Sequence, residues 1–236
     1  MELTEDSILD GAIKLLQPKY GYRVAIDPVI LASFVKLTAY QRVLDVGCGV
    51  GAIALILKKR EPVAEITAID MDTEMCKICE RNSRANALSL DVVNTDVENY
   101  SHSREKLFDH VVTNPPFFKK ESSRVSESKK WANVETIDLS HWIQCCFRML
   151  KNNGIFSMIH RAARLDEILG ALKGIGSIQI IPIYPKSNRE AKRVVVRVVK
   201  SRKSETKILP GIVAHQDNDG YTYTILQMLS GNRFVK

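Results

Sequence analysis

Residues 43–51 have the sequence Val43-Leu44-Asp45-Val46-Gly47-Cys48-Gly49-Val50-Gly51, followed by the apolar stretch 52–57 and by Lys58-Lys59-Arg60. A short apolar run, three alternating glycines and a longer apolar stretch together predict a strand, a tight turn and a helix. Glycine has no Cβ, so a ligand can approach the backbone of such a turn, and the start of the next helix offers unpaired N–H groups. The G-x-G-x-G spacing differs from the dinucleotide fingerprint G-x-G-x-x-G. The loop therefore predicts a cofactor site, and nicotinamide cofactors are disfavoured.

Strand and helix patterns alternate through the rest of the chain. Further strands are predicted at 65–70, 90–94, 108–113, 155–160, 178–183 and 193–200, and helices at 72–86, 138–150 and 164–173. This alternation predicts an α/β fold in which a mostly parallel sheet of seven strands has helices on both faces. Only about nine residues separate the last two strands, too few for a helical crossover. The last strand is therefore expected to be antiparallel.

The first 38 residues are predicted to form an extension of one domain that spans residues 1–236. Asp10-Gly11 stands between apolar pairs, which predicts a hairpin turn with a short helix as the alternative. Asp27-Pro28 predicts the start of a helix over 27–37, because proline suits the first helical position. A chain of this length can bury a single core. We expect the extension to cover the cofactor site.

Composition excludes several classes of protein. The apolar fraction of 45% and the charged fraction of 26% are those of an ordinary globular chain. The amino terminus is acidic, and no apolar stretch is long enough to cross a bilayer. The cysteine count is odd, and Cys76 and Cys79 have metal-ligand spacing but lack the second pair or the histidines that a structural zinc site needs. We therefore expect a cytoplasmic protein with reduced thiols, no membrane partner and no metal.

The net charge of +7 is concentrated in one segment. Residues 186–207 contain nine Lys or Arg and two Glu, so the rest of the chain is balanced, and a second excess lies at 119–130. Concentrated positive charge suits a phosphate-bearing partner such as a nucleic acid. A solvated strand edge protected by Lys and Arg is the alternative.

Acidic residues end the first strands. Asp70 ends the strand 65–70, and its carboxylate could accept both hydrogen bonds of a ribose diol. It could instead cap the next helix, although Asp72 could also supply that cap. Asp96 follows the third strand and could accept from an adenine amine on the same ligand. Together with Asp45, three acidic residues end three successive strands.

The fourth strand is followed by Asn114-Pro115-Pro116-Phe117. The exocyclic amine of adenine is a poor nucleophile, because its lone pair is delocalised into the ring. The Asn114 side-chain oxygen and the carbonyl before Pro116 could each accept one N–H, which would localise that lone pair. Two prolines would hold these acceptors rigidly, and Phe117 could stack on a base held outside its helix or loop. The alternative is a turn that merely ends the strand, since Asn and Pro favour turns.

The glycine loop, the acid ending the second strand, the Asp past the third strand and N-P-P-F together resemble the class I S-adenosylmethionine (SAM) methyltransferases that act on planar amino nitrogens. The flanking segments 18–32, 159–165, 192–197 and 220–222 resemble the bacterial tRNA1(Val) (adenine(37)-N6)-methyltransferases, which modify the purine beside the anticodon of a valine tRNA. The likeness extends from about residue 6 to 229. That family usually has a small residue where Pro28 stands, a departure that bears on helix entry.

This resemblance implies a Rossmann-like fold, SAM as cofactor with S-adenosylhomocysteine as product, and methylation of an adenine N6 in the anticodon loop of tRNA. The cofactor contacts it implies are Asp45, Gly47, Gly49, Gly51, Asp70 and Asp96. Asp27 would border the methionine end of the cofactor, although a helix-capping Asp would look the same. Asn114, Pro115, Pro116 and Phe117 would meet the target base, and the candidates for RNA contact are Lys119, Lys120, Arg124, Arg193 and Arg197.

Three other functions remain open at this point. The same N-P-P motif serves enzymes that methylate bases of ribosomal RNA and enzymes that methylate glutamine in proteins. A non-catalytic RNA-binding protein could also retain the scaffold. We expect a monomer or a weak dimer.

Overall fold

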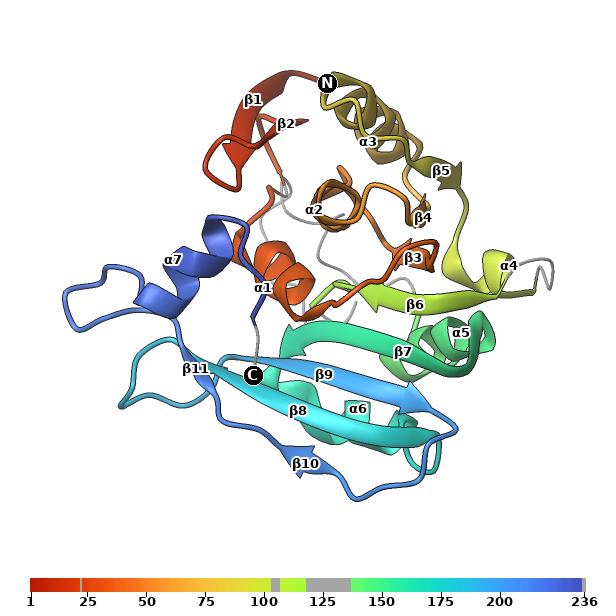
Figure 1. Ribbon diagram of the computed structural model, residues 1–236, viewed down its shortest axis with the longest axis vertical. Coiled ribbons are helices and arrows are strands. Elements are labelled where there is room, and N and C mark those ends of the chain that lie inside the picture. Colours follow the sequence, from red (N-terminus) through yellow and green to blue (C-terminus); the bar gives the residue numbers. More distant parts are fainter. Residues whose placement is uncertain (22, 103–106, 118–136, 235–236) are drawn as a thin grey trace.

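The computed structural model describes residues 1–21, 23–102, 107–117 and 137–234. Its centre is a mixed sheet with the strand order β10-β8-β9-β7-β6-β3-β4-β5, and β11 also pairs with β8 (Figure 1). The strands are β3 (Arg42–Val46), β4 (Glu65–Asp70), β5 (Asp91–Asn94), β6 (Phe108–Thr113), β7 (Leu150–Arg161), β8 (Gly176–Tyr184), β9 (Arg193–Lys200), β10 (Lys207–Ile208) and β11 (Ile212–Val213).

The predicted seven-stranded, mostly parallel sheet is confirmed. Neighbouring strands are parallel except at β9, which is antiparallel to both β7 and β8. Two strands were not predicted: β10 and β11 have two residues each, too few for a periodic pattern, and they extend the sheet beyond β8.

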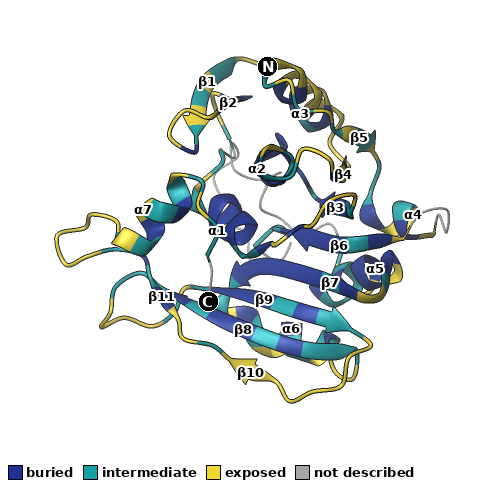
Figure 2. Ribbon diagram, viewed as in Figure 1, coloured by how far each residue is buried: buried dark blue, intermediate teal, exposed yellow. Residues whose placement is uncertain are grey.

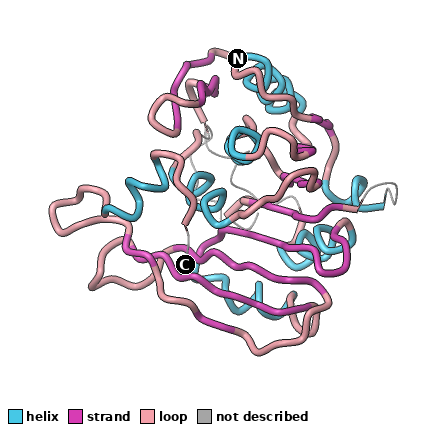
Figure 3. Tube along the Cα trace, viewed as in Figure 1, coloured by secondary structure: helices cyan, strands magenta, loops and turns pink. Residues whose placement is uncertain are grey.

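Helices cover both faces of the sheet (Figure 3). One face carries α1 (Ile26–Phe34), α2 (Ala52–Arg60), α3 (Thr73–Ala85) and α7 (Tyr223–Leu229), and the other carries α4 (Val97–His102), α5 (Leu139–Arg148) and α6 (Leu165–Ala171), with a 3₁₀ turn at Ala162–Arg164. Successive strand residues enter opposite apolar clusters, as Val43 and Leu44 do. The middle strands are therefore buried on both faces (Figure 2).

The helix predicted at 27–37 is wrong at both ends. It begins one residue earlier, at Ile26, with Ala25 at the N-cap, and Val35 is already extended. Pro28 is therefore the third helical residue, a place in the first turn where its missing N–H costs nothing. Asp27 lies inside the helix, so it is not a cap.

The first 18 residues form a hairpin rather than the alternative short helix. Strands β1 (Leu3–Ile8) and β2 (Ile13–Pro18) pair antiparallel. The turn between them has positive φ at Leu9, Asp10 and Gly11. The hairpin is a sheet of its own, separate from the main one.

Asn82 of α3 and Asn86, the residue that follows the helix, dock this hairpin. The buried Asn82 side chain accepts from the Leu16 N–H at 2.7 Å and donates to the Leu16 and Val50 carbonyls, each at 2.9 Å. One helical turn later, Asn86 accepts from the Lys14 N–H at 2.8 Å and donates to the Lys14 carbonyl at 2.7 Å. These amides replace a missing neighbouring strand, so they place the hairpin beside the glycine loop.

We predict that Asn82→Ala lowers the free energy of unfolding by about 2–4 kcal/mol, because it leaves buried backbone groups without partners. Asn86→Ala is the matched control: its site is half-buried, so water can replace the lost bonds. The measurement is urea unfolding of both variants and the wild type. Equal losses for the two variants would contradict the role given to burial.

Candidate active site

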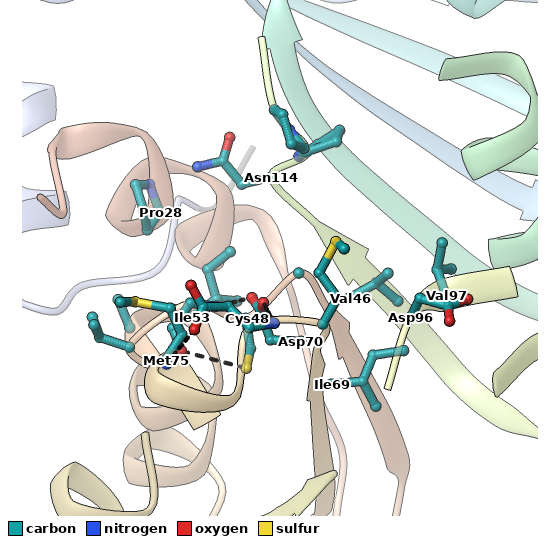
Figure 4. A pocket seen from close by; sticks show the side chains of 18 of the residues that line it. Pro28, Val46, Cys48, Ile53, Ile69, Asp70, Met75, Asp96, Val97 and Asn114 are labelled. Atoms are coloured by element: carbon teal, nitrogen blue, oxygen red, sulfur yellow. Dashed lines mark hydrogen bonds between the residues drawn. The ribbon is translucent and has the colours of Figure 1, made fainter. Parts of the chain in front are cut away.

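Four loops leave the sheet at one edge, where the parallel strands end, here called the carboxyl edge. Val46 is in register with Ile69 on one side and Thr113 on the other, and Asp70 is in register with Asn94. The loops after β3, β4, β5 and β6 therefore begin side by side. They line a cavity of about 640 Å³ (Figure 4), a size typical of small-molecule sites.

The glycine loop forms the floor of this cavity. The N–H groups of Gly47 and Cys48 both donate to the Ile69 carbonyl, at 2.9 and 3.0 Å, which fixes the loop to β4. A Cβ on Gly49 would meet nothing within 4 Å. Gly49 has a φ of +54° and lines the cavity, so its backbone is bare toward a ligand.

The other two glycines are required by packing. A Cβ on Gly47 would lie 3.2 Å from the Trp142 ring, and one on Gly51 would lie 2.5 Å from the Cys79 Sγ. Gly47 lines the cavity, whereas Gly51 does not. Gly51 therefore brings α2 close to α3, and the structure does not place it where a cofactor would be contacted.

Asp70 presents a carboxylate to the cavity. Its Oδ2 accepts from the Gly49 N–H at 2.8 Å and its Oδ1 from the Asp72 N–H at 2.9 Å. Burial raises the pKa of Asp70. Asp72 caps α3, accepting from the N–H groups of Glu74 and Met75. The cap is thus supplied by Asp72, and a carboxylate with about four acceptor sites leaves Asp70 capacity for a ligand.

The three remaining acidic candidates already have hydrogen-bond partners within the protein. Asp45 is fully buried outside the cavity lining, and its Oδ2 accepts from the Ala54 N–H at 3.1 Å. Asp96 lines the cavity, but its carboxylate accepts from both the backbone and the side-chain amide of Asn99. Asp27 lies outside the lining and accepts from Arg193 at 2.8 Å. The structure thus brings only Asp96 of these three to the cavity.

The turn Asn114–Phe117 lines the cavity across from the glycine loop. In Figure 4, Asn114 and Pro28 lie on one side, and Cys48, Asp70 and Met75 lie on the other. The hydroxyl of Thr113, the residue before the turn, donates to the Val46 carbonyl at 2.8 Å and accepts from the Trp142 indole at 3.1 Å. The start of the turn is therefore tied to the strand that carries the glycine loop.

His160 of β7 supports the second half of the turn. His160 Nε2 lies 3.3 Å from the Pro116 carbonyl, which can only accept, so this nitrogen carries the proton. Its Nδ1 is buried without a hydrogen-bond partner among the described residues, and burial lowers the pKa of His160 to about 4. The imidazole is therefore neutral at physiological pH.

Phe117 is also held, by two neighbours. Its ring meets the His160 ring edge to face with centroids 5.3 Å apart, and the Arg193 guanidinium lies 4.6 Å from its centroid. Arg193 in turn pairs with Asp27. Arg193, which was predicted to contact RNA, therefore also supports the turn of the site.

The other RNA candidates lie elsewhere. Arg197 stands within β9, half-buried, and donates to the Gln179 side chain at 3.1 Å; burial lowers its pKa. It is not at the carboxyl edge. Lys119, Lys120 and Arg124 lie outside the described residues.

Sequence reasoning missed several residues that line the cavity. Trp142 comes from α5, and nothing in its helix distinguishes it from a core aromatic. Met71 follows Asp70 directly, so its position could have been predicted from adjacency. Tyr20 also lines the cavity and is 70% exposed, within a segment that the resemblance had singled out.

All five cysteines are buried free thiols. The described ranges contain no group of three His, Cys, Asp or Glu side chains placed to hold a metal ion. Within the same ranges, no helix has the length and apolar character needed to cross a membrane.

Residues 25–135 match the family model of the methyltransferase small domain. Curated relatives include the tRNA1(Val) (adenine(37)-N6)-methyltransferase of Shewanella baltica (strain OS185), 28% identical over 222 residues that cover 89% of this chain and 91% of the relative. The enzyme of that name from Aeromonas hydrophila is 26% identical over 215 residues, covering 88% of this chain and 89% of its own.

Solved structures agree in fold. A predicted O-methyltransferase from Agrobacterium tumefaciens has a TM-score of 0.74 at 22% identity, covering 89% of this chain and 99% of that one. The type I restriction-modification methyltransferase subunit from Streptococcus thermophilus has a TM-score of 0.59 at 17% identity, covering 81% and 47%.

The chain is a class I SAM-dependent methyltransferase with a Rossmann-like fold. Within that class it resembles the tRNA1(Val) (adenine(37)-N6)-methyltransferases along most of its length, which confirms the likeness inferred from its motifs.

The carboxyl of Asp45 gives a prediction about pH. Burial raises its pKa from 3.8 to about 7, so between these values the folded protein holds a proton that the unfolded chain releases. The contribution of Asp45 to stability therefore falls as pH rises through this window. Relative to Asp45→Asn, which keeps an acceptor for Ala54, the wild type should lose about 2–4 kcal/mol. Urea unfolding across the window measures this. If the unfolding free energies of the wild type and of Asp45→Asn change in parallel with pH, Asp45 ionises as readily in the folded as in the unfolded protein, and the prediction is wrong.

Proposed function

We propose that this enzyme transfers a methyl group from SAM to the exocyclic N6 of an adenine in tRNA, at the anticodon-loop position that the names of its relatives specify. The observation that supports this most is the placement of Asn114–Phe117 opposite the glycine loop in one cavity. The names of the similar enzymes point to the same substrate.

The residues at the floor of the cavity fit SAM. The open space at Gly49 leaves room for a ligand against the backbone, and the Asp70 carboxylate can accept from a ribose diol. We propose that Gly47, Gly49 and Asp70 hold the cofactor, that Asp96 borders its adenine, and that residues 1–38 cover it. When bound, SAM supplies an electrophilic methyl group.

The turn supplies the acceptors. The Asn114 side-chain oxygen and the Pro115 carbonyl each accept one N–H of the target amine, which makes its lone pair available. Proline rings fix φ at residues 115 and 116, and His160 holds the Pro116 carbonyl, so the acceptors do not have to be ordered at the moment of reaction. Phe117 stacks on the extruded base. Orientation provides most of the rate advantage, and no strong general base is required.

The test is incubation of the purified enzyme with labelled SAM and total tRNA from a strain that lacks the activity. Label is expected in N6-methyladenosine, and mass spectrometry of digested tRNA locates the nucleotide. Ribosomal RNA and a release factor are parallel substrates, because other enzymes with an N-P-P motif methylate these. Label in either of them but not in tRNA would overturn the proposal. Size-exclusion chromatography tests the accompanying proposal of a monomer or weak dimer, and cell fractionation tests a cytoplasmic location.

Asn114→Ala should lower kcat for tRNA by about 10²–10³-fold, because its oxygen acts on the target amine rather than on the cofactor. Calorimetry should find the affinity for SAM unchanged. Asp70→Ala should do the reverse, weakening SAM binding by at least about tenfold through the loss of a charged acceptor. Equal losses of turnover and cofactor affinity in the Asn114 variant would remove its assigned role.

A further inference from the structure

The basic segment 186–207 is divided between two opposite edges of the sheet. Arg193 starts β9 in register with Arg161, at the end of β7, whereas Lys200 ends β9 in register with Gly176, at the start of β8. Residues 186–193 therefore lie at the carboxyl edge with the cavity. Residues 200–207 begin at the other end of β9. At about 3.3 Å per residue, Lys200 is about 23 Å from Arg193.

The loop 185–192 between β8 and β9 presents exposed cations at the carboxyl edge. Arg189 and Lys192 are exposed, and Glu190 between them is the loop's one acidic residue. Lys192 directly precedes Arg193, whose guanidinium lies over the Phe117 ring. The side chain of Lys192 is thus attached one residue from a group that touches the turn of the active site.

Backbone and ion-pair contacts fix this loop. The Lys192 N–H donates to the Ile183 carbonyl at 3.0 Å, and its carbonyl accepts from the Ala162 N–H at 3.1 Å. At the other end, Lys186 pairs with Asp219 at 2.8 Å, and its carbonyl accepts from the Arg189 N–H at 3.1 Å. The exposed cations are therefore carried on an ordered support, which lowers the entropy cost of using them.

Screening separates the two halves of the segment. The Debye length is about 8 Å at physiological ionic strength. The far end of β9 is more than two such lengths from the turn, so Arg202 and Lys203 interact little with a phosphate beside a base held in the cavity. The two groups of cations are separated in space because β9 runs from one edge of the sheet to the other, and not merely because they are separated in the sequence.

We propose that Arg189 and Lys192 bind the phosphate backbone of the RNA loop that carries the target nucleotide, and that the cations at 200–207 do not contribute. This inference rests on the proposed function, since it assigns a surface to the RNA substrate. The recognised group is the phosphodiester backbone, so these contacts favour RNA over a free nucleoside and carry no base specificity.

The test compares two double variants of equal charge change. Arg189→Ala with Lys192→Ala removes two exposed cations at the carboxyl edge, and Arg202→Ala with Lys203→Ala removes two exposed cations at the opposite edge, so each lowers the net charge from +7 to +5. Dissociation constants for tRNA are measured over a range of salt concentrations. The first variant should bind tRNA about tenfold more weakly, and its salt slope should fall by about 1–2. The second should stay within about twofold of the wild type.

The SAM affinity and thermal unfolding of both double variants should match those of the wild type, which separates a lost RNA contact from a lost fold. If the wild type methylates tRNA but the two variants bind it equally well, or lose equal affinity, the assignment of this surface is overturned and the proposed function stands. If the wild type neither binds nor methylates tRNA, the proposed function fails and this inference fails with it.

Discussion

The register of β3 with its two neighbours decides where every group of the site lies. Val46 pairs with Ile69 of one neighbouring strand and with Thr113 of the other. Gly47, Asp70 and Asn114 each follow one of these three paired residues, so they lie next to one another at the carboxyl edge. A slip of one residue would turn these side chains to opposite faces of the sheet. These three strands send alternate residues into two different apolar clusters, so a slip would force both clusters to repack.

A second constraint acts on the turn after β6. Two prolines remove two N–H groups, so the turn cannot be held by its own backbone donors at these positions. It is held by partners from distant parts of the chain: Thr113 by Trp142 and Val46, Pro116 by His160, and Phe117 by Arg193. A charged imidazole would leave a buried N–H without an acceptor, and the low pKa of His160 avoids that cost.

These contacts explain how far the sequence could predict the site. The bounds of β3, β4, β6 and β9 follow from apolar runs that end in glycine, acidic or turn residues, which are local signals. The role of each carboxylate, by contrast, depends on which N–H groups the fold brings near it. Asp96 accepts from the N–H of Asn99, only three residues later, whereas the pairing of Asp27 with Arg193 joins residues far apart in sequence. Helix α7 and strands β10 and β11 are too short for periodicity to show.

Charge along a chain and charge on a surface are different quantities. The segment 186–207 carries a net excess of positive charge in the sequence, yet it follows an antiparallel strand from one edge of the sheet to the other. Within it, Arg193 is used to hold an aromatic ring and Arg197 to bridge neighbouring strands, so the central cations are structural. The cations that stay available to a partner at the cavity are decided by the direction of the strand and by burial. A count of Lys and Arg in the sequence gives neither. Because β9 runs antiparallel between β7 and β8, it divides the excess charge of the segment between the two ends of these strands.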